Sequence, residues 1–167
     1  MQWEKITDII LITALAVIGV FAILGLVEWI KRKSLKKVDR ELLAMIPPLV
    51  LMAATYFIFD HIFILNTRPN GSGEPSFPSS HTMATATIFL MTMLALKKYI
   101  KNKSLRIFLD VVMLILIVLV SVGRVAANMH WTSDVIGALI FSLIFIAIYY
   151  LLIRPKKTEL KKESKDE

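Results

Sequence analysis

The chain alternates between long uncharged blocks and short polar segments, and this pattern predicts its architecture. Uncharged blocks of 18 to 20 residues cover 9–27, 42–59, 77–96 and 135–153, and a shorter block at 111–123 extends past Asp110 into 107–109. A helix needs roughly 20 apolar residues to cross a bilayer. We therefore predict five transmembrane helices, at about 6–30, 42–65, 80–97, 106–123 and 133–153.

Composition supports the same class of protein. Of the 167 residues, 56% are hydrophobic, whereas a soluble domain rarely exceeds about half. No internal repeat or second domain is evident, so we expect residues 1–167 to form a single membrane domain. The predicted fold class is all-α, an integral membrane helical bundle, with a charged and flexible tail at 155–167.

The distribution of charge predicts which side of the membrane each loop faces. Of the 20 Lys and Arg residues, 17 lie in the alternate polar segments 31–41, 97–106 and 154–167. Basic loops stay in the cytoplasm, which leaves the amino terminus and the loops 66–80 and 124–132 on the extracytoplasmic face of the cell membrane. The net charge of +7 is then a topology signal. No nucleic-acid-reading motif accompanies it, so no nucleic acid partner is predicted.

The outward segments contain an unusual set of ionisable residues. Such residues are costly at membrane depth and are functional by default. The set includes every histidine of the chain and two of its few outward cations: His61, His81, His130, Arg68 and Arg124.

Several of these residues suit phosphate chemistry. Arg68 and Arg124 offer planar forks of donors that match phosphate oxygens. Pro78 sets the chain direction before a helix, and we expect the N–H groups of 79–81 to be free and to form an anion site at the helix start.

A histidine and a carboxylate four residues apart indicate a nucleophile. His130 and Asp134 would share one helix face, so the carboxylate could hold one imidazole nitrogen protonated and leave the other with an exposed lone pair. Such a histidine can attack phosphorus, and His81 can protonate the leaving oxygen. Metal binding is the competing use of these residues. The chain has no HExxH spacing and no cysteine, and two arginines would repel a cation, so no metal or cofactor is predicted.

Taken together, these residues resemble the type 2 phosphatidic acid phosphatase (PAP2) family, which shares its site with vanadium haloperoxidases. The family pattern is Lys-x6-Arg-Pro, then Pro-Ser-Gly-His, then Ser-Arg-x5-His-x3-Asp. The matching residues here are Arg68-Pro69, then Pro78-Ser79-Ser80-His81, then Arg124, His130 and Asp134. The resemblance covers about 60–139, and three parts in order on one face of a membrane are a specific signal.

The resemblance implies a role for each matching residue. His130 would be the nucleophile that forms a phosphohistidine, Asp134 would orient it, and His81 would act as general acid and then as base. The phosphoryl oxygens would be held by Arg68, Arg124, the Ser79 hydroxyl and the Ser80 N–H. The family also implies a PAP2/haloperoxidase-like core and a metal-free reaction.

The chain departs from the family pattern at three positions and in helix number. His61 occupies the place of the family lysine, and we expect it to bind phosphate less strongly than either arginine. Ser80 replaces the family glycine, and Gly123 replaces the serine before Arg124. The family commonly has six core helices, whereas five are predicted here.

The expected function is metal-independent hydrolysis of a lipid phosphate or diphosphate on the extracytoplasmic face. The outer loops are too short for a lid over a large soluble substrate. The family's bacterial substrates are polyprenyl diphosphate and phosphatidylglycerophosphate, and the outward site and small size favour undecaprenyl diphosphate. Membrane lipids are the expected surroundings. Two alternatives remain open: a lipid phosphotransferase, and a non-catalytic lipid-binding or transport protein with a degenerate site, for which His61 is the best argument.

Overall fold

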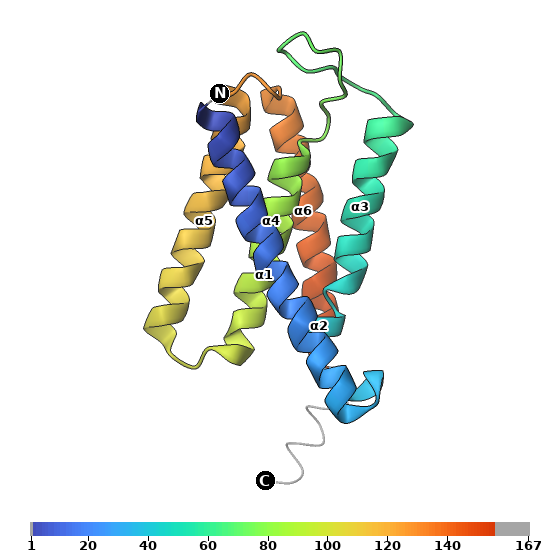
Figure 1. Cartoon of the computed structure of the whole chain (residues 1–167), viewed down its shortest axis with the longest axis vertical. Coiled ribbons are helices and arrows are strands. Elements are labelled where there is room, and N and C mark those ends of the chain that lie inside the picture. The colour runs from blue at the N-terminus through green and yellow to red at the C-terminus, as the bar shows by residue number, and fades with distance from the viewer. Residues whose placement is uncertain (1, 156–167) are drawn as a thin grey trace.

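The computed structural model describes residues 2–155 and consists of helices joined by short connections (Figure 1). Within the described residues no β-strand forms, which confirms the all-α class. The tail predicted at 155–167 lies outside the described residues beyond position 155. The elements are α1 (Gln2–Arg32), the 3-10 turn η1 (Leu35–Lys37), α2 (Arg40–Leu43), α3 (Ile46–His61), α4 (Ser80–Tyr99), α5 (Lys103–Ala126) and α6 (Thr132–Ile153).

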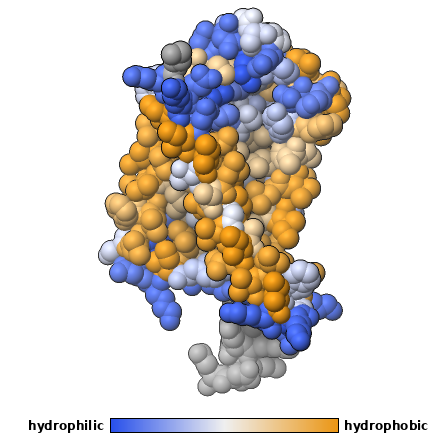
Figure 2. Space-filling view, in the orientation of Figure 1, coloured by the Kyte–Doolittle hydropathy of each residue, from blue (hydrophilic) through white to orange (hydrophobic). Residues whose placement is uncertain are grey.

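Four stretches are long and apolar enough to cross a membrane: Gln2–Arg32, Arg40–His61, Lys103–Ala126 and Thr132–Ile153. Their outward side chains are largely apolar, because lipid rather than water is expected to surround them. Figure 2 shows the result as a hydrophobic band between two hydrophilic ends. The molecule is a multi-pass membrane protein.

The fifth long helix, α4, differs from the other four because it is enclosed by protein. It packs against α1, α5 and α6. Its four threonines, Thr82, Thr85, Thr87 and Thr92, are all buried. Thr87 donates a hydrogen bond to Ser142 of α6 at 3.1 Å, so at least part of this polar surface is satisfied inside the bundle. The predicted helix at 80–97 is thus present, but as the centre of the bundle.

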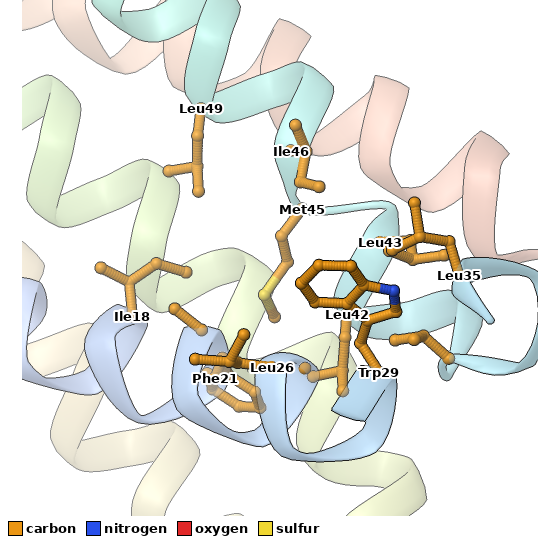
Figure 3. Close-up of a pocket in the computed structure, with 13 residues that line it drawn as sticks. Ile18, Phe21, Leu26, Trp29, Leu35, Leu42, Leu43, Met45, Ile46 and Leu49 are labelled. Carbon is orange, nitrogen blue, oxygen red and sulfur yellow. The ribbon is translucent and has the colours of Figure 1, made fainter. Parts of the chain in front are cut away.

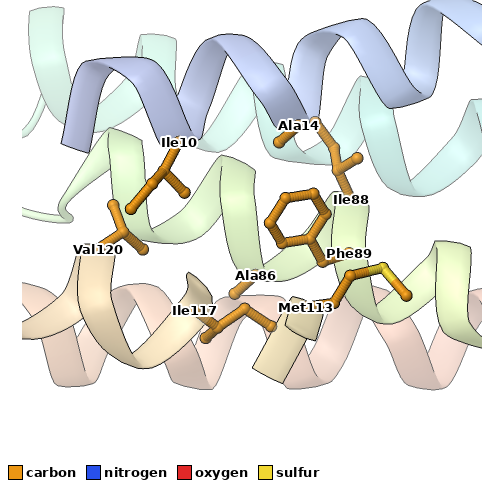
Figure 4. Close-up of a cluster of buried hydrophobic side chains, with 8 residues drawn as sticks. All are labelled: Ile10, Ala14, Ala86, Ile88, Phe89, Met113, Ile117 and Val120. Carbon is orange, nitrogen blue, oxygen red and sulfur yellow. The ribbon is translucent and has the colours of Figure 1, made fainter. Parts of the chain in front are cut away.

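Apolar side chains from three helices hold α1 and α5 against α4 (Figure 4). Ala14 and Ala86 are fully buried, and small residues at such contacts let helix backbones approach closely. Val120 lies one turn from Arg124, so this core also fixes the height of Arg124 in the bundle. The cluster comprises Ile10, Ala14, Ala86, Ile88, Phe89, Met113, Ile117 and Val120.

The second predicted helix, at 42–65, is wrong at both of its ends. The chain forms α2, breaks at 44–45 and begins again as α3, which ends at His61. Pro47 and Pro48 lie in the first turn of α3, where a missing N–H removes no helical hydrogen bond. They begin a helix and do not kink one. The apolar residues 62–65 are exposed and non-helical.

The two ends of the bundle carry different polar residues. At one end, Lys98 pairs with Asp39 at 3.0 Å and with Glu41 at 2.6 Å, and Arg40 donates to the carbonyls of Leu152 and Arg154. The opposite end holds the start of α1, the loop 62–79 and the loop 127–131 (Figure 1). The residues predicted to carry chemistry all lie at this second end.

Candidate active site

The first turns of α4 and α6 are joined through Ser79. Its backbone N–H donates to the carbonyl of Asp134 at 3.1 Å, and its buried hydroxyl donates to Thr82 at 3.1 Å. The expectation that the Ser79 N–H is free for an anion is therefore wrong, because the junction between α4 and α6 uses it. A phosphate-binding role for the Ser79 hydroxyl remains a prediction.

The His130 side chain is buried and held in one orientation. Its Nδ1 lies 2.8 Å from the carbonyl oxygen of Ser76, and because a carbonyl only accepts, Nδ1 carries the proton. This leaves Nε2 with its lone pair, as a nucleophile requires. Asp134 Oδ2 is 3.7 Å from Nδ1 and instead accepts the Trp131 N–H at 2.9 Å. The nearest partner of His130 is thus a backbone carbonyl, which no sequence motif indicates.

The surroundings of His130 favour its neutral form. Burial, followed by the positive charge of Arg124, lowers the pKa of His130 to about 4 from its ordinary value of 6.5. Arg68 acts in the same direction, while the Ser76 carbonyl and Asp134 oppose it. Both arginines are therefore close enough to affect His130, and the imidazole is uncharged at neutral pH.

Helix α1 contributes two residues to the same region. Asp8 Oδ1 lies 3.0 Å from His81 Nε2 and 3.7 Å from Arg124 Nη1. Thr7, fully buried, accepts a hydrogen bond from Arg124 Nη1 at 3.4 Å. No sequence motif indicates Asp8 or Thr7, because they lie far from the motif residues along the chain.

Arg68 and His61 are placed differently. Arg68 pairs with Glu74 at 2.8 Å across the loop, and a backbone hydrogen bond from Arg68 N–H to the Glu74 carbonyl at 3.0 Å supports the pairing. The His61 side chain is 54% exposed and lies 3.4 Å from Asp60. It stacks on Phe57, with ring centroids 4.7 Å apart. His61 does not line the cleft described next, whereas Asp60 does.

Two adjoining hollows meet beside these residues. The polar cleft, lined among others by Tyr56, Arg68, Ser76, Ser80 and His130, has a volume of ≈ 30 Å³, so only a compact group can enter it. The apolar groove between α1, α3 and α4 has a volume of ≈ 300 Å³. Tyr56 and Ser80 line both hollows, so the polar cleft opens beside an apolar surface. The remaining groove-lining residues are Leu11, Leu15, Met52, Ala53, His81, Met83 and Ala84.

Polar atoms without hydrogen-bond partners gather at this site. Among the described residues, seven buried side-chain nitrogen or oxygen atoms have no partner. Five of them belong to site residues: Arg68 Nε, Ser76 Oγ, His81 Nδ1, Arg124 Nε and His130 Nε2. Buried polar groups are normally satisfied, so this grouping points to a ligand rich in oxygen. No three His, Asp or Glu side chains within residues 2–155 gather as metal ligands would.

A second apolar pocket lies toward the opposite end of the bundle (Figure 3). It has a volume of ≈ 290 Å³ and is enclosed by α1, η1, α2 and the start of α3. Its lining, which includes Phe21, Trp29 and Met45, contains no ionisable side chain. It therefore offers nothing for phosphate chemistry.

Comparison with known families decides what kind of protein carries this site. A family model described as the PAP2 superfamily matches residues 57–158, which is more than half of the chain. The chain belongs to the PAP2 superfamily. Among solved structures, this PAP2 protein is similar to a transmembrane PAP2-type phosphatidylglycerolphosphate phosphatase from Bacillus subtilis. The identity is 18%, the TM-score is 0.59, and the match covers 90% of this chain and 82% of that one. No curated protein matches the chain. The PAP2 protein is thus a membrane phosphatase whose fold is shared with that relative.

One departure from the PAP2 motif has a packing explanation. Gly123 replaces the motif serine, and a Cβ atom there would lie 2.6 Å from Cγ2 of Thr7 and 3.3 Å from the Trp3 ring. Thr7 therefore occupies the space that a side chain at 123 would need. The chain lacks the motif hydroxyl at position 123, but the Thr7 hydroxyl lies beside Arg124 and accepts a hydrogen bond from it.

Proposed function

We propose that this PAP2 protein hydrolyses a lipid phosphate or diphosphate through a phosphohistidine at His130, without a metal ion. The observation that supports this most directly is that five buried polar atoms of site residues have no partner. Three of them belong to residues that line the polar cleft, Arg68, Ser76 and His130. The five include a nucleophilic lone pair, two guanidinium N–H groups and a second imidazole. A phosphoryl group offers one electrophilic atom and several oxygen acceptors, which matches this set.

The reaction follows from the two histidines. The Nε2 lone pair of His130 attacks phosphorus while the bond to the leaving oxygen breaks, and His81 gives that oxygen a proton. Water then attacks the phosphohistidine and loses a proton to His81, and the N–P bond breaks to release phosphate. The guanidinium groups of Arg68 and Arg124 stabilise the charge on the phosphoryl oxygens in both steps.

The apolar groove supports a lipid as the substrate. Because Tyr56 and Ser80 line both hollows, a phosphate in the polar cleft can keep its hydrocarbon tail against Leu11, Leu15 and Met52 in the groove. Helices α1 and α3, which border the groove, diverge toward this end of the bundle (Figure 1). Such a tail would never need to leave the bilayer.

The basic residues at the opposite end support an extracytoplasmic position for the site. Two lipids that fit a compact head and a membrane-resident tail are undecaprenyl diphosphate and phosphatidylglycerophosphate. The solved relative is described as a phosphatidylglycerolphosphate phosphatase, but at 18% identity it does not favour either lipid as the substrate of this chain.

The test is phosphate release from both lipids by the purified protein in detergent with a chelator present. We expect turnover to persist with the chelator and His130→Ala to lower it by about 10³-fold or more, because removing a nucleophile removes the reaction path. Loss of activity with the chelator would refute the metal-free mechanism.

His61→Ala is the matched control, since it removes an exposed imidazole outside the polar cleft. We expect it to retain most of the activity. If His61→Ala abolishes turnover as fully as His130→Ala, the ranking of the two histidines is wrong.

A further inference from the structure

We propose that Asp8 of α1 is a positioning residue for this reaction and that it acts through His81. The inference rests on the proposed function, because it assigns His81 the role of general acid. No part of the PAP2 motif includes Asp8, which lies 73 positions before His81.

Asp8 is within hydrogen-bond distance of one ring nitrogen of His81, and the other ring nitrogen is left for the substrate. Asp8 Oδ1 is 3.0 Å from His81 Nε2, a hydrogen-bond distance. His81 Nδ1 is buried and has no partner. With Nε2–H donated to the carboxylate, the ring cannot flip without losing this bond, so Nδ1 remains the nitrogen without a protein partner.

The carboxylate also favours the charged form of the ring. An anion at hydrogen-bond distance stabilises an imidazolium relative to a neutral imidazole. This matters because Arg124 Nη1 lies 3.7 Å from the same carboxylate oxygen, and a cation so near would otherwise oppose a second positive charge. Burial and the charge of Arg124 lower the pKa of His81 from its ordinary value, and Asp8, which contacts both side chains, opposes that shift.

The proton moves only on the Nδ1 side of the ring. As the bond between phosphorus and the leaving oxygen breaks, Nδ1–H protonates that oxygen and yields an alcohol, while Nε2–H stays bonded to Asp8. When water attacks the phosphohistidine, Nδ1 takes the proton that the water loses. Asp8 remains a carboxylate throughout, so the residue holds and stabilises His81 but does not touch the substrate.

The experiment compares two leaving groups in the Asp8→Asn variant. Dioctanoyl phosphatidic acid releases an alkoxide, which needs a proton, whereas 4-nitrophenyl phosphate releases a stable phenolate, which does not. We expect kcat/KM to fall by about 10- to 100-fold on phosphatidic acid and by less than about threefold on 4-nitrophenyl phosphate, since general acid catalysis is worth about 10²- to 10⁴-fold in all. Retained activity on 4-nitrophenyl phosphate also shows that the variant is folded.

Equal losses on the two substrates would overturn the role of Asp8, because a purely structural or phosphate-binding defect does not distinguish leaving groups. In a His81→Gln background, Asp8→Asn should cause no further loss on phosphatidic acid, and an additional loss would also overturn it. Glu28→Gln, at the other end of α1, is the matched control and should change neither rate. If the wild type hydrolyses neither these two substrates nor undecaprenyl diphosphate or phosphatidylglycerophosphate, the proposed function itself fails, which is a separate result.

Discussion

At the scale of single residues, the burial of His130 keeps its imidazole neutral and also makes the stability of the fold depend on pH. The side chain is 3% exposed, and its pKa is lowered to about 4. A nucleophilic imidazole must be neutral, and burial keeps it neutral over the whole physiological range. The same burial makes folding sensitive to pH, because an unfolded chain binds a proton that the folded protein excludes.

We predict that stability falls as the pH falls from about 6.5 to about 4, the window between the unfolded and folded pKa values of His130. Above that window the contribution is fully present, since both states are neutral. Each pKa unit corresponds to about 1.4 kcal/mol, so the loss is at most about 3 to 4 kcal/mol. Thermal unfolding in detergent should show a steeper pH dependence for the wild type than for His130→Gln. His61→Gln should keep the wild-type slope; equal slopes for the wild type and His130→Gln would contradict the prediction.

The proposed site residues that belong to a local motif could be inferred from the sequence, whereas those outside the motif could not. His81, His130, Arg68 and Arg124 are recognisable from type and spacing. The Ser76 carbonyl is a backbone atom, which residue identity does not reveal. Asp8 is one carboxylate on a distant helix, and only the packing of α1 against α4 and α5 brings it to His81.

At the scale of elements, a glycine on α6 positions the loop that precedes α4. A Cβ atom at Gly137 would lie 2.3 and 2.6 Å from ring atoms of Phe77. Phe77 also packs edge-on against Phe59, with ring centroids 5.3 Å apart. Phe77 lies between Ser76 and Pro78 in the chain. The packing of its ring against Gly137 therefore determines where the Ser76 carbonyl lies relative to His130.

We therefore predict that Gly137→Ala lowers kcat by about 10- to 100-fold, since a displacement of about 1 Å at a catalytic group can cost that much. The ring must shift, and the Ser76 carbonyl shifts with it. Turnover of the purified variant in detergent measures the effect. Gly19→Ala is the control, because no atom lies within 4 Å of a Cβ there. Wild-type turnover in Gly137→Ala would show that the packing of Phe77 against Gly137 does not affect catalysis.

Hydrophobic pattern predicted the helices well, but not their surroundings. It placed α1, α4, α5 and α6 within a few residues, because long apolar runs have few alternatives to a helix. It missed the break at 44–45, where turn geometry and the placement of Pro47 and Pro48 decide the outcome. It also treated α4 like the others, since an apolar run does not reveal whether lipid or protein surrounds it.

At the scale of the whole molecule, the proposed orientation can be tested directly because the chain contains no cysteine. Ser72→Cys places a thiol in the exposed loop at the active-site end, and Lys101→Cys places one in the exposed loop at the basic end. We predict that a membrane-impermeant maleimide labels Ser72→Cys in intact cells and Lys101→Cys only after lysis, because basic loops remain in the cytoplasm. The reverse pattern would place the site in the cytoplasm.

The threonine-bearing surface of α4 also affects how the chain is made. A nascent segment partitions from the translocation channel into lipid according to its own apolarity, and α4 is the one long helix among the described residues that falls short of a membrane span. The Ser142 partner of Thr87 is synthesised 55 residues later. We therefore expect stable integration of α4 to depend on α6, and a ribosome stalled before α6 would leave the helix that carries His81 poorly retained in the bilayer.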